Sequence, residues 1–442
     1  MSMLMPVIVG AGPAGIRAAQ ALAAQGLRPV ILDEGLRPGG QIYRQPPPGF
    51  SRPKSALYGF EHRKADAVHR TMEGLLASVE YRPGCLVWNA EGKTLDVLRD
   101  GVSTAVPYTH LILATGATDR VLPFPGWLTP GVYTLGGSQV ALKHQGCAIG
   151  ERVAFMGTGP LLYLVAYQYA KAGAKVAAVL DTSRFGDRAA ALPGMLRAPA
   201  LLAKGLYYMA WLRAHGVPLR SGVRPVAVQG KERVTGLTYL QGGRTRSVDC
   251  DAVGFGLSLR SETQLASLVG CEFEFNERDR NWTPRRDAAG RSSVPGVYVA
   301  GDGAAIGGAD AADVRGAQAL EVRLAANSRV RDALERAFPF PKDWAAGIAD
   351  DTVVCRCEEV TAGTIRLAAR TTAAHEMNRL KALTRVGMGR CQGRMCGVAA
   401  GEVLAHAVGC SPALGGRLRN QPPVKPVPVA VVCLERPRQR AA

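Results

Sequence analysis

Short apolar runs and helical patterns alternate along most of this chain of 442 residues. The first apolar run, residues 7–9, leads into a glycine-rich turn, an alanine-rich helical pattern over residues 16–25 and a second apolar run over residues 29–32. Apolar runs of this length predict buried strands, and two strands joined by a helix are typical of parallel pairing. The pattern therefore predicts an α/β protein that opens with a βαβ unit.

The turn in this unit has the glycine spacing of a dinucleotide-binding loop. Gly10 permits a tight turn, Gly12 lets the backbone approach a pyrophosphate, and Gly15 lets the helix pack on the strand, with its free N-terminal amides facing the phosphates. An acid about twenty residues further on binds the ribose hydroxyls in such sites, and this spacing slightly favours Asp33 over Glu34. The predicted site consists of Gly10, Gly12, Pro13, Ala14, Gly15 and either Asp33 or Glu34.

Three later stretches are expected to complete this site. The glycine pair before Gln41 lets the backbone approach a large flat ligand that the Gln41 amide can hydrogen-bond. Two further apolar runs, residues 111–113 and 295–300, predict buried strands that end in small residues, as close passage of the chain requires. The residues added to the site are Gly40, Gln41, Ala114, Thr115, Gly116, Gly301 and Asp302.

The remaining patterns predict the elements between these motifs. Residues 54–78 and 314–326 have helical patterns, whereas residues 79–99 predict short strands with a turn near Gly92.

A second strand, glycine turn, helix and strand begin at residue 152. Gly157, Gly159 and Asp181 repeat the positions of the first motif, but Leu162 replaces the third glycine. A leucine there should push the helix away from the strand and weaken a standard dinucleotide fit. Two interpretations stay open, an adenine-nucleotide site (NAD or ATP) and a scaffold without a ligand.

The formal net charge of +18 raises nucleic-acid binding as a function. We do not expect it, because the arginines are scattered and no nucleic-acid motif accompanies them. The proline-rich basic stretch over residues 417–440 predicts an extended segment draped over the fold or over a partner. No apolar run reaches membrane-spanning length, residues 1–5 lack a charged leader, and residues 190–214 favour core or partner packing over a membrane anchor. We expect a cytoplasmic protein, with peripheral contact to the inner face of the membrane as the alternative.

The ten cysteines divide into six single residues and one cluster of four. We expect no disulfides in a reducing compartment, and we expect the single cysteines to be small buried hydrophobic residues: Cys85, Cys147, Cys250, Cys271, Cys410 and Cys433. The cluster consists of two close pairs, Cys355 with Cys357 and Cys391 with Cys396, and the segment between the pairs predicts two short helices. Four thiolates suit a 2Fe-2S cluster or a structural zinc ion, and the spacing favours iron. Arg356, Arg390 and Arg394 are expected to offset the negative charge of the cluster.

Taken together, the motifs resemble the two-dinucleotide flavoprotein superfamily, in which an NAD(P)-type domain interrupts an FAD domain. The resemblance implies that Gly301 and Asp302 hold the ribityl and pyrophosphate part of FAD, and that residues 114–116 pass beside the flavin nucleotide. The cysteine segment resembles ferredoxin domains of the bacterioferritin-associated type, although four residues separate its second pair where two are common. The redox cysteine pair of the disulfide reductases in this superfamily is missing from residues 1–350.

A closer resemblance, to the alpha (A) subunits of heteromeric amino-acid dehydrogenases, covers nearly the whole chain. Opine oxidases, hydroxyproline dehydrogenases, hydrogen cyanide synthase and dye-linked proline dehydrogenases form this group, and the resemblance rests on residues 38–44, 114–117 and 123–127 with the cysteine cluster. It implies a D-amino-acid-oxidase-like FAD beta subunit that oxidises the amino acid, imino acid or opine. A respiratory-chain acceptor and a small ferredoxin-like gamma subunit are further candidate partners.

The expected architecture is therefore two Rossmann-like domains followed by a small helical 2Fe-2S domain. We expect a discontinuous FAD domain at residues 1–148 and 258–335 and an NAD(P)-like domain at residues 149–257, followed by the 2Fe-2S domain at residues 350–412 and the basic tail at residues 413–442.

We assign no catalytic residue, because the seven histidines lie apart in the sequence and favour structural roles. Besides the electron-transferring role, two functions stay open: a self-contained NAD(P)H-dependent flavin oxidoreductase and a nucleotide-sensing scaffold.

Overall fold

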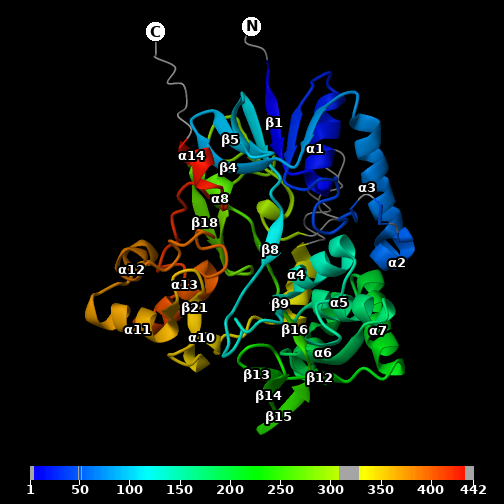
Figure 1. Cartoon of the computed structure of the whole chain (residues 1–442), viewed down its shortest axis with the longest axis vertical. Coiled ribbons are helices and arrows are strands. Elements are labelled where there is room, and N and C mark those ends of the chain that lie inside the picture. Colours follow the sequence, from blue (N-terminus) through cyan, green and yellow to red (C-terminus); the bar gives the residue numbers. More distant parts are fainter. Residues whose placement is uncertain (1–3, 48, 51, 308–327, 434–442) are drawn as a thin grey trace.

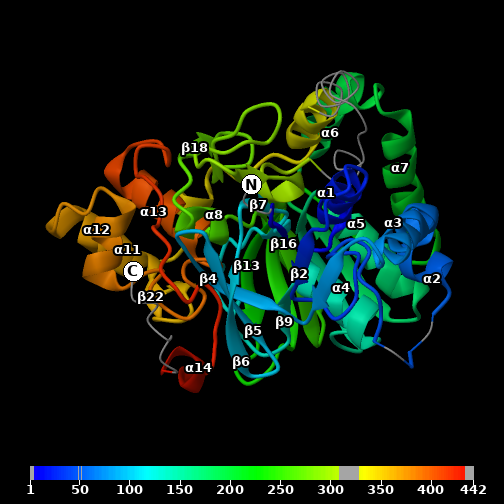
Figure 2. The same cartoon turned by 90° about the horizontal axis from the view of Figure 1, so that it is seen from above.

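The computed structural model describes residues 4–47, 49–50, 52–307 and 328–433. Figure 1 shows an N-terminal part (blue and cyan), a second part (green) and a small C-terminal part (orange). Figure 2 shows that the C-terminal part and helix α7 (Pro199–Ala214) lie on opposite sides of the molecule. The helix predicted over residues 314–326 falls outside the described residues.

The N-terminal part is built on a five-stranded parallel sheet in the order β20-β7-β1-β2-β3. These strands are β1 (Pro6–Val9), β2 (Val30–Asp33), β3 (Glu80–Pro83), β7 (His110–Leu113) and β20 (Val297–Val299). Strand β20 pairs with β7 although the entire second sheet lies between them in the sequence. The opening unit is therefore completed only where the chain returns, as the strand-end motifs predict.

Both faces of this sheet are covered, which explains its uninterrupted apolar strands. Ile8 and Ile31 pack against the helices on one face, whereas Val7 and Val9 pack toward a three-stranded antiparallel sheet on the other. The covering elements are α1 (Pro13–Ala23), α2 (Lys54–Tyr58), η1 (Gly59–Glu61), α3 (His62–Leu75), β4 (Leu86–Glu91), β5 (Thr94–Arg99) and β6 (Val102–Pro107). The helical and strand patterns predicted over residues 54–99 are confirmed.

The second part contains another five-stranded parallel sheet, in the order β12-β11-β10-β16-β9. Its strands are β9 (Val132–Thr134), β10 (Arg152–Thr158), β11 (Lys175–Asp181), β12 (Leu219–Ser221) and β16 (Ala252–Leu257). The predicted boundary between residues 148 and 149 does not coincide with the sheets, because β9 already belongs to this one. The two parts are joined instead by an antiparallel pair, β8 (Ala117–Asp119) with β17 (Leu259–Ser261).

Helices and a small antiparallel sheet surround the second sheet. They are α4 (Leu135–Val140), the π-helix η2 (Ala141–Gln145), α5 (Pro160–Lys171), α6 (Phe185–Met195), α7, β13 (Val223–Gln229), β14 (Gly236–Gln241) and β15 (Arg244–Asp249). Helix α7 buries Tyr208 and Leu212 but exposes Leu206 and Tyr207. Within the described ranges, no helix is long and apolar enough to cross a membrane.

The C-terminal part is a small helical domain with its own core, in which Ile365, Leu380 and Val403 are fully buried. Its elements are α10 (Trp344–Gly347), β21 (Val353–Cys355), β22 (Val360–Thr361), α11 (Ala362–Thr371), α12 (Met377–Thr384) and α13 (Gly397–Val408). The side chain of Thr361 accepts a hydrogen bond from the Thr364 amide and so caps α11. The two helices predicted between the cysteine pairs are confirmed as α11 and α12.

A hairpin of β18 (Phe273–Asn276) and β19 (Asn281–Pro284), preceded by α8 (Gln264–Leu268), lies on the side of the N-terminal part that faces this domain. The chain after α13 then runs back over the N-terminal part to α14 (Val429–Cys433). The Val424 amide donates to the carbonyl of Trp88 on β4, at 3.0 Å, and Lys425 forms an ion pair with Glu34. The prediction that the tail drapes over the fold is confirmed for its described residues.

Among the single cysteines, Cys85, Cys250 and Cys271 are buried as predicted. The prediction is wrong for Cys147, which is exposed directly after the π-helix, and Cys410 is only half-buried. The side chain of Cys433 lies outside the described residues.

Candidate cofactor sites

The first glycine motif forms the turn between β1 and α1. A Cβ atom on Gly15 would lie 1.8 Å from the carbonyl oxygen of Gly10, and one on Gly10 would lie 2.3 Å from the carbonyl oxygen of Ala114. Neither position tolerates a side chain, because real Cβ contacts are never this short. The helix therefore meets the strand as closely as the sequence pattern predicts.

The N-terminus of α1 has the properties of a phosphate site. Gly12 occupies the cap position without a side-chain hydrogen bond, and Pro13 begins the helix, so the first-turn amides have no side-chain acceptor at the cap. A Cβ on Gly40 would lie 2.9 Å from the Cα of Gly12, which brings the predicted glycine pair next to the turn. Backbone amides, the helix dipole and missing Cβ atoms together fit a pyrophosphate group.

The two candidate ribose acids differ in their surroundings. Asp33 accepts hydrogen bonds from the amides of Ala11 and Gly35, the latter at 2.6 Å, and burial raises the pKa of its carboxyl group. Glu34 is exposed, and it forms the ion pair with Lys425 of the tail. Asp33, at the end of β2, thus stabilises the glycine turn through its hydrogen bond with the Ala11 amide, while Glu34 contacts the tail.

The other two strand-end motifs meet the turn from β7 and β20. A Cβ on Gly301 would lie 2.7 Å from the Cβ of Ala14, and one on Gly303 would lie 2.9 Å from Oγ1 of Thr115. Asp302 accepts a hydrogen bond from the Gly307 amide at 2.8 Å. Gly116 has a φ of 72°, which suits a glycine. The structure thus brings three motifs from distant parts of the sequence to the carboxyl ends of β1, β7 and β20, where open α/β sheets bind their ligands.

The loop after Gly40 places polar groups beside this site. Gln41 is exposed, and its side-chain oxygen accepts a hydrogen bond from Arg44 at 3.0 Å. Lys143, on the π-helix η2, is only 4% exposed and donates to the carbonyl oxygen of Ile42 at 3.3 Å. Burial, followed by the charge of Arg44, lowers the pKa of Lys143 to about 8.

The second glycine motif differs from the first at the helix. Leu162 is fully buried where Gly15 stands in the first motif, so α5 cannot approach its turn as closely. A Cβ on Gly157 would lie 1.8 Å from the carbonyl oxygen of Gly256, whereas nothing lies within 4 Å of one on Gly159. The space beside Gly159 is compatible with a ligand.

Asp181 does not offer its carboxylate to such a ligand. The side chain is fully buried, one oxygen accepts from the Tyr163 hydroxyl at 2.6 Å, and the other accepts from the Ser183 amide at 2.8 Å. The predicted ribose contact by Asp181 therefore disagrees with its surroundings, because Tyr163 takes the place of a nucleotide hydroxyl.

The four clustered cysteines converge in the C-terminal domain. Cys355 and Cys396, both buried, are hydrogen-bonded to each other through their side chains, and Cys357 and Cys391 form a second such pair. The pKa of Cys355 is lowered to about 6, mainly by the hydrogen bond from Cys396 and also by the amides of Gly387, Glu358 and Cys357. The same bond, together with burial, raises the pKa of Cys396.

This arrangement fits a 2Fe-2S cluster better than a zinc ion. Zinc requires four ligands around one centre, whereas a two-iron cluster requires two thiolates at each iron. Two thiol pairs with amide donors toward Cys355 match the two-iron alternative.

The three arginines that flank the clustered cysteines have different surroundings. Arg356 and Arg390 are exposed, and Arg394 forms an ion pair with Glu262, with Nε 2.9 Å from the carboxylate. Arg260, which no sequence pattern singles out, is 7% exposed and lies close enough for the charges of Cys391 and Cys396 to raise its pKa, although burial lowers that pKa overall. Its Nη2 donates to the carbonyl oxygen of Arg394 at 2.6 Å.

Glu262 links this loop to the first site. Its amide donates to the carbonyl oxygen of Gly116 at 2.9 Å, and its carbonyl oxygen accepts from Oγ1 of Thr115 at 2.6 Å. Gln264 donates to the carbonyl oxygens of Cys391 and Gln392, at 3.1 and 2.9 Å. One strand end therefore holds the first glycine site and the cysteine loop together. No sequence pattern singles out Glu262 or Gln264.

Five of the seven histidines form hydrogen bonds with nearby groups. Ring nitrogens of His62, His69, His144 and His215 bond to backbone carbonyl oxygens, and that of His110 bonds to Thr109. No histidine is placed as a general base by these contacts.

Two family matches agree with this geometry. Residues 6–321 match the pyridine nucleotide-disulphide oxidoreductases, and residues 353–406 match the BFD-like 2Fe-2S binding domain. The chain is therefore a flavoprotein oxidoreductase of this family, with FAD and a 2Fe-2S cluster as its cofactors.

Within this class, the chain belongs to the A subunits of heteromeric FAD-dependent amino-acid dehydrogenases. It is 35% identical to the A subunit of opine oxidase from Rhizobium meliloti, over 96% of this chain and 86% of that protein. It is 34% identical to hydrogen cyanide synthase subunit HcnB of Pseudomonas aeruginosa, over 96% of this chain and 97% of that protein. L-proline dehydrogenase from P. horikoshii shares the fold, with a TM-score of 0.68 at 20% identity over 98% of this chain and 79% of that chain.

Proposed function

We propose that this chain is the electron-transferring alpha subunit of a heteromeric dehydrogenase, whose beta subunit oxidises an amino acid, an imino acid of the hydroxyproline type or an opine. When bound, FAD supplies two-electron chemistry and a 2Fe-2S cluster supplies one-electron transfer. The chain's own residues hold these groups, align them and shield them from water.

The observation that supports this role best is the continuous link between the two cofactor sites. Thr115 at the first site bonds to Glu262, and Glu262 pairs with Arg394 in the cysteine loop. These side chains are largely buried, with 14% of the Glu262 side chain and 18% of the Arg394 side chain exposed. A largely buried contact between two redox sites supports transfer between them, because it holds the sites close together.

The residues that we propose as ligands follow from the geometry above. FAD would be held by Gly10, Gly12, Pro13, Ala14, Gly15, Gly40, Gln41, Ala114, Thr115, Gly116, Gly301 and Asp302, with Asp33 or Glu34 toward the ribose. The cluster would be held by Cys355, Cys357, Cys391 and Cys396. An adenine nucleotide, NAD or ATP, is proposed for the space beside Gly159.

The partners follow from the relatives, which are named as subunits of larger enzymes. We propose a D-amino-acid-oxidase-like FAD beta subunit, a respiratory-chain acceptor and a small ferredoxin-like gamma subunit.

Anaerobic mixing of the purified chain with NADH tests the role. The proposal predicts that the flavin stays oxidised until substrate is added together with the beta subunit. Rapid bleaching of the flavin by NADH alone would instead show a self-contained reductase.

A further inference from the structure

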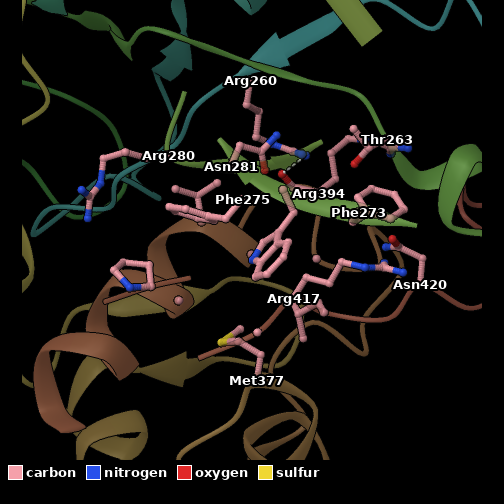
Figure 3. Close-up of a pocket in the computed structure, with 18 of the residues that line it drawn as sticks. Arg260, Thr263, Phe273, Phe275, Arg280, Asn281, Met377, Arg394, Arg417 and Asn420 are labelled. Carbon is pink, nitrogen blue, oxygen red and sulfur yellow. Dashed lines mark hydrogen bonds between the residues drawn. The ribbon is translucent and has the colours of Figure 1, made fainter. Parts of the chain in front are cut away.

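A buried arginine of the N-terminal part reaches the cysteine loop of the C-terminal domain. Arg260 lies in the middle of β17, where its backbone pairs with Thr118 of β8. The residue is only 7% exposed, and its Nη2 donates to the carbonyl oxygen of Arg394 at 2.6 Å. Figure 3 shows the side chain of Arg260 directed toward Arg394. The guanidinium group is thus held against the loop that carries Cys391 and Cys396.

The hydrogen bonds of Arg260 do not neutralise its charge. Nη1 donates to the carbonyl oxygen of Ser261 at 3.4 Å and Nη2 to that of Arg394, and both acceptors are uncharged. Glu262 is the acid whose charge acts most strongly on Arg260, but its carboxylate already forms the ion pair with Arg394. One carboxylate therefore faces two guanidinium groups, and one positive charge remains.

The remaining charge acts on the clustered cysteines. Burial lowers the pKa of the Arg260 guanidinium group, whereas the charges of Glu262, Cys391 and Cys396 raise it. The same attraction holds in the other direction, so Arg260 favours negative charge on these sulfur atoms. Gln264 fixes the loop from the same segment, because its side-chain nitrogen donates to the carbonyl oxygen of Cys391 at 3.1 Å.

The arginines next to the cysteines in sequence have a different environment. Arg356 and Arg390 are exposed, and water and salt screen exposed charges far more than buried ones. Burial, and not proximity in the sequence, therefore determines which arginine acts most strongly on the clustered cysteines.

We propose that Arg260 supplies the buried positive charge that raises the reduction potential of the 2Fe-2S cluster. Reduction adds one electron to a group that four thiolates already make negative. A fixed positive charge nearby stabilises the reduced form more than the oxidised form, so it raises the potential. With an effective dielectric constant of about 20, a buried unit charge within about 10 Å changes the ratio of the two forms roughly tenfold.

The consequence for electron transfer rests on the function proposed above. A cluster with a higher potential accepts electrons from a flavin more readily, because the two groups compete for the same electrons. Arg260 and Glu262 belong to one short segment, and Glu262 bonds to Thr115 and Gly116 at the first site. The segment that fixes the cysteine loop would therefore also set the affinity of the cluster for electrons.

Potentiometric titration of the purified holoprotein tests the assignment without the partner subunit. The electron paramagnetic resonance signal of the reduced cluster gives the ratio of reduced to oxidised cluster at each potential. Arg260→Met should lower this ratio roughly tenfold at a given potential, which corresponds to a midpoint about 59 mV lower. Arg260→Lys keeps the charge and should stay within about twofold of the wild type. Both variants lose the guanidinium contact with the Arg394 carbonyl group, so their difference measures the effect of the charge.

Arg356→Gln and Arg390→Gln are the matched controls, because both arginines flank cysteines of the cluster but are exposed. Each should change the ratio by less than about twofold. An unchanged ratio in Arg260→Met, equal shifts in Arg260→Met and Arg260→Lys, or an equally large shift in either control would overturn the proposal.

Arg260→Gln provides a second neutral variant in case Arg260→Met folds poorly. Loss of iron from both neutral variants, with full iron content in Arg260→Lys, would also support a role of the charge, whereas loss of iron from all three would overturn it. A loaded wild type whose cluster stays oxidised while the beta subunit consumes substrate would instead contradict the proposed function. That result would leave the measured potentials as they are, so the two failures are distinguishable.

Discussion

The Glu262 carboxylate lies 2.9 Å from Nε of Arg394, although 132 residues separate them in sequence. Glu262 is bound through its backbone to Thr115 and Gly116, and Arg394 lies in the loop between Cys391 and Cys396. This ion pair fixes the cysteine loop against the end of the first glycine site. A substitution that breaks this ion pair should therefore weaken the connection between the two sites.

Glu262→Gln should lower the free energy of unfolding by about 2 kcal/mol, because Arg394 keeps its charge in a largely buried place. It should also slow electron transfer between the cofactors while the flavin and iron contents stay unchanged. Stopped-flow absorbance of the complex measures the transfer, and denaturant titration measures the stability. Glu272→Gln is the control, since Glu272 pairs with Arg285 at the surface with side chains 63% and 65% exposed, and it should change stability by less than about 1 kcal/mol. Equal effects of the two variants would show that the Glu262 contact has no special role.

Substitution of a clustered cysteine should remove iron from the chain, whereas substitution of a single cysteine should not. Cys396→Ser should remove most of the iron and the visible absorbance of the cluster, and it should destabilise the C-terminal domain, because metal binding contributes to folding. Cys410→Ser, at a half-buried position outside the cluster, should retain both. Iron analysis and absorbance spectra of the two purified variants check this expectation, and full iron content in Cys396→Ser would exclude Cys396 as a ligand.

Gly15→Ala should abolish FAD binding or folding, because the added Cβ would lie 1.8 Å from the Gly10 carbonyl oxygen. The matched substitution is Gly205→Ala in α7, where nothing lies within 4 Å of the added atom. There alanine should stabilise the chain by about 0.5–1 kcal/mol through its higher helix propensity. Flavin content and thermal unfolding distinguish the two outcomes. Normal flavin content in Gly15→Ala would contradict the proposed packing of α1 on β1.

Because of Lys143, the free energy of unfolding of the chain should increase as the pH rises above about 8. Its pKa is about 8 in the folded chain and 10.5 without burial, so the unfolded state binds more protons between these values. The cost of burying the charge is complete below pH 8 and is relieved as the pH rises toward 10.5.

Lys143→Met should therefore stabilise the chain at neutral pH by up to about 3 kcal/mol, and this gain should shrink toward pH 10. Denaturant titrations of the variant and the wild type at neutral pH and at pH 10 measure this gain. Lys175→Met, at an exposed position, should show no such gain. A gain from Lys143→Met that is constant with pH would show that burial of the charge is not its cause.

The sequence predicts those parts of the molecule that depend on local patterns. The turn at Gly10, the strands β7 and β20 that precede Gly116 and Gly301, and the helices α11 and α12 follow from glycine spacing and apolar periodicity. The structure confirms these elements.

Contacts between distant segments could not be predicted in this way. Asp181 has the spacing of a ribose acid, but its role depends on Tyr163, whose hydroxyl reaches it from α5. Arg394 flanks the clustered cysteines in sequence, but its ion pair with Glu262 depends on the end of β17 lying beside the cysteine loop. Strand β9 joins the second sheet through pairing with β16, which no local pattern indicates.

The most direct test is the pair of absorbance and electron paramagnetic resonance spectra of the complex purified with its partner subunit. Candidate imino acids, amino acids and opines serve as reductants under anaerobic conditions. We expect iron in the chain, bleaching of the flavin by one of these substrates and the appearance of the signal of a reduced 2Fe-2S cluster. Zinc in place of iron, or a cluster that stays oxidised while substrate is consumed, would contradict it.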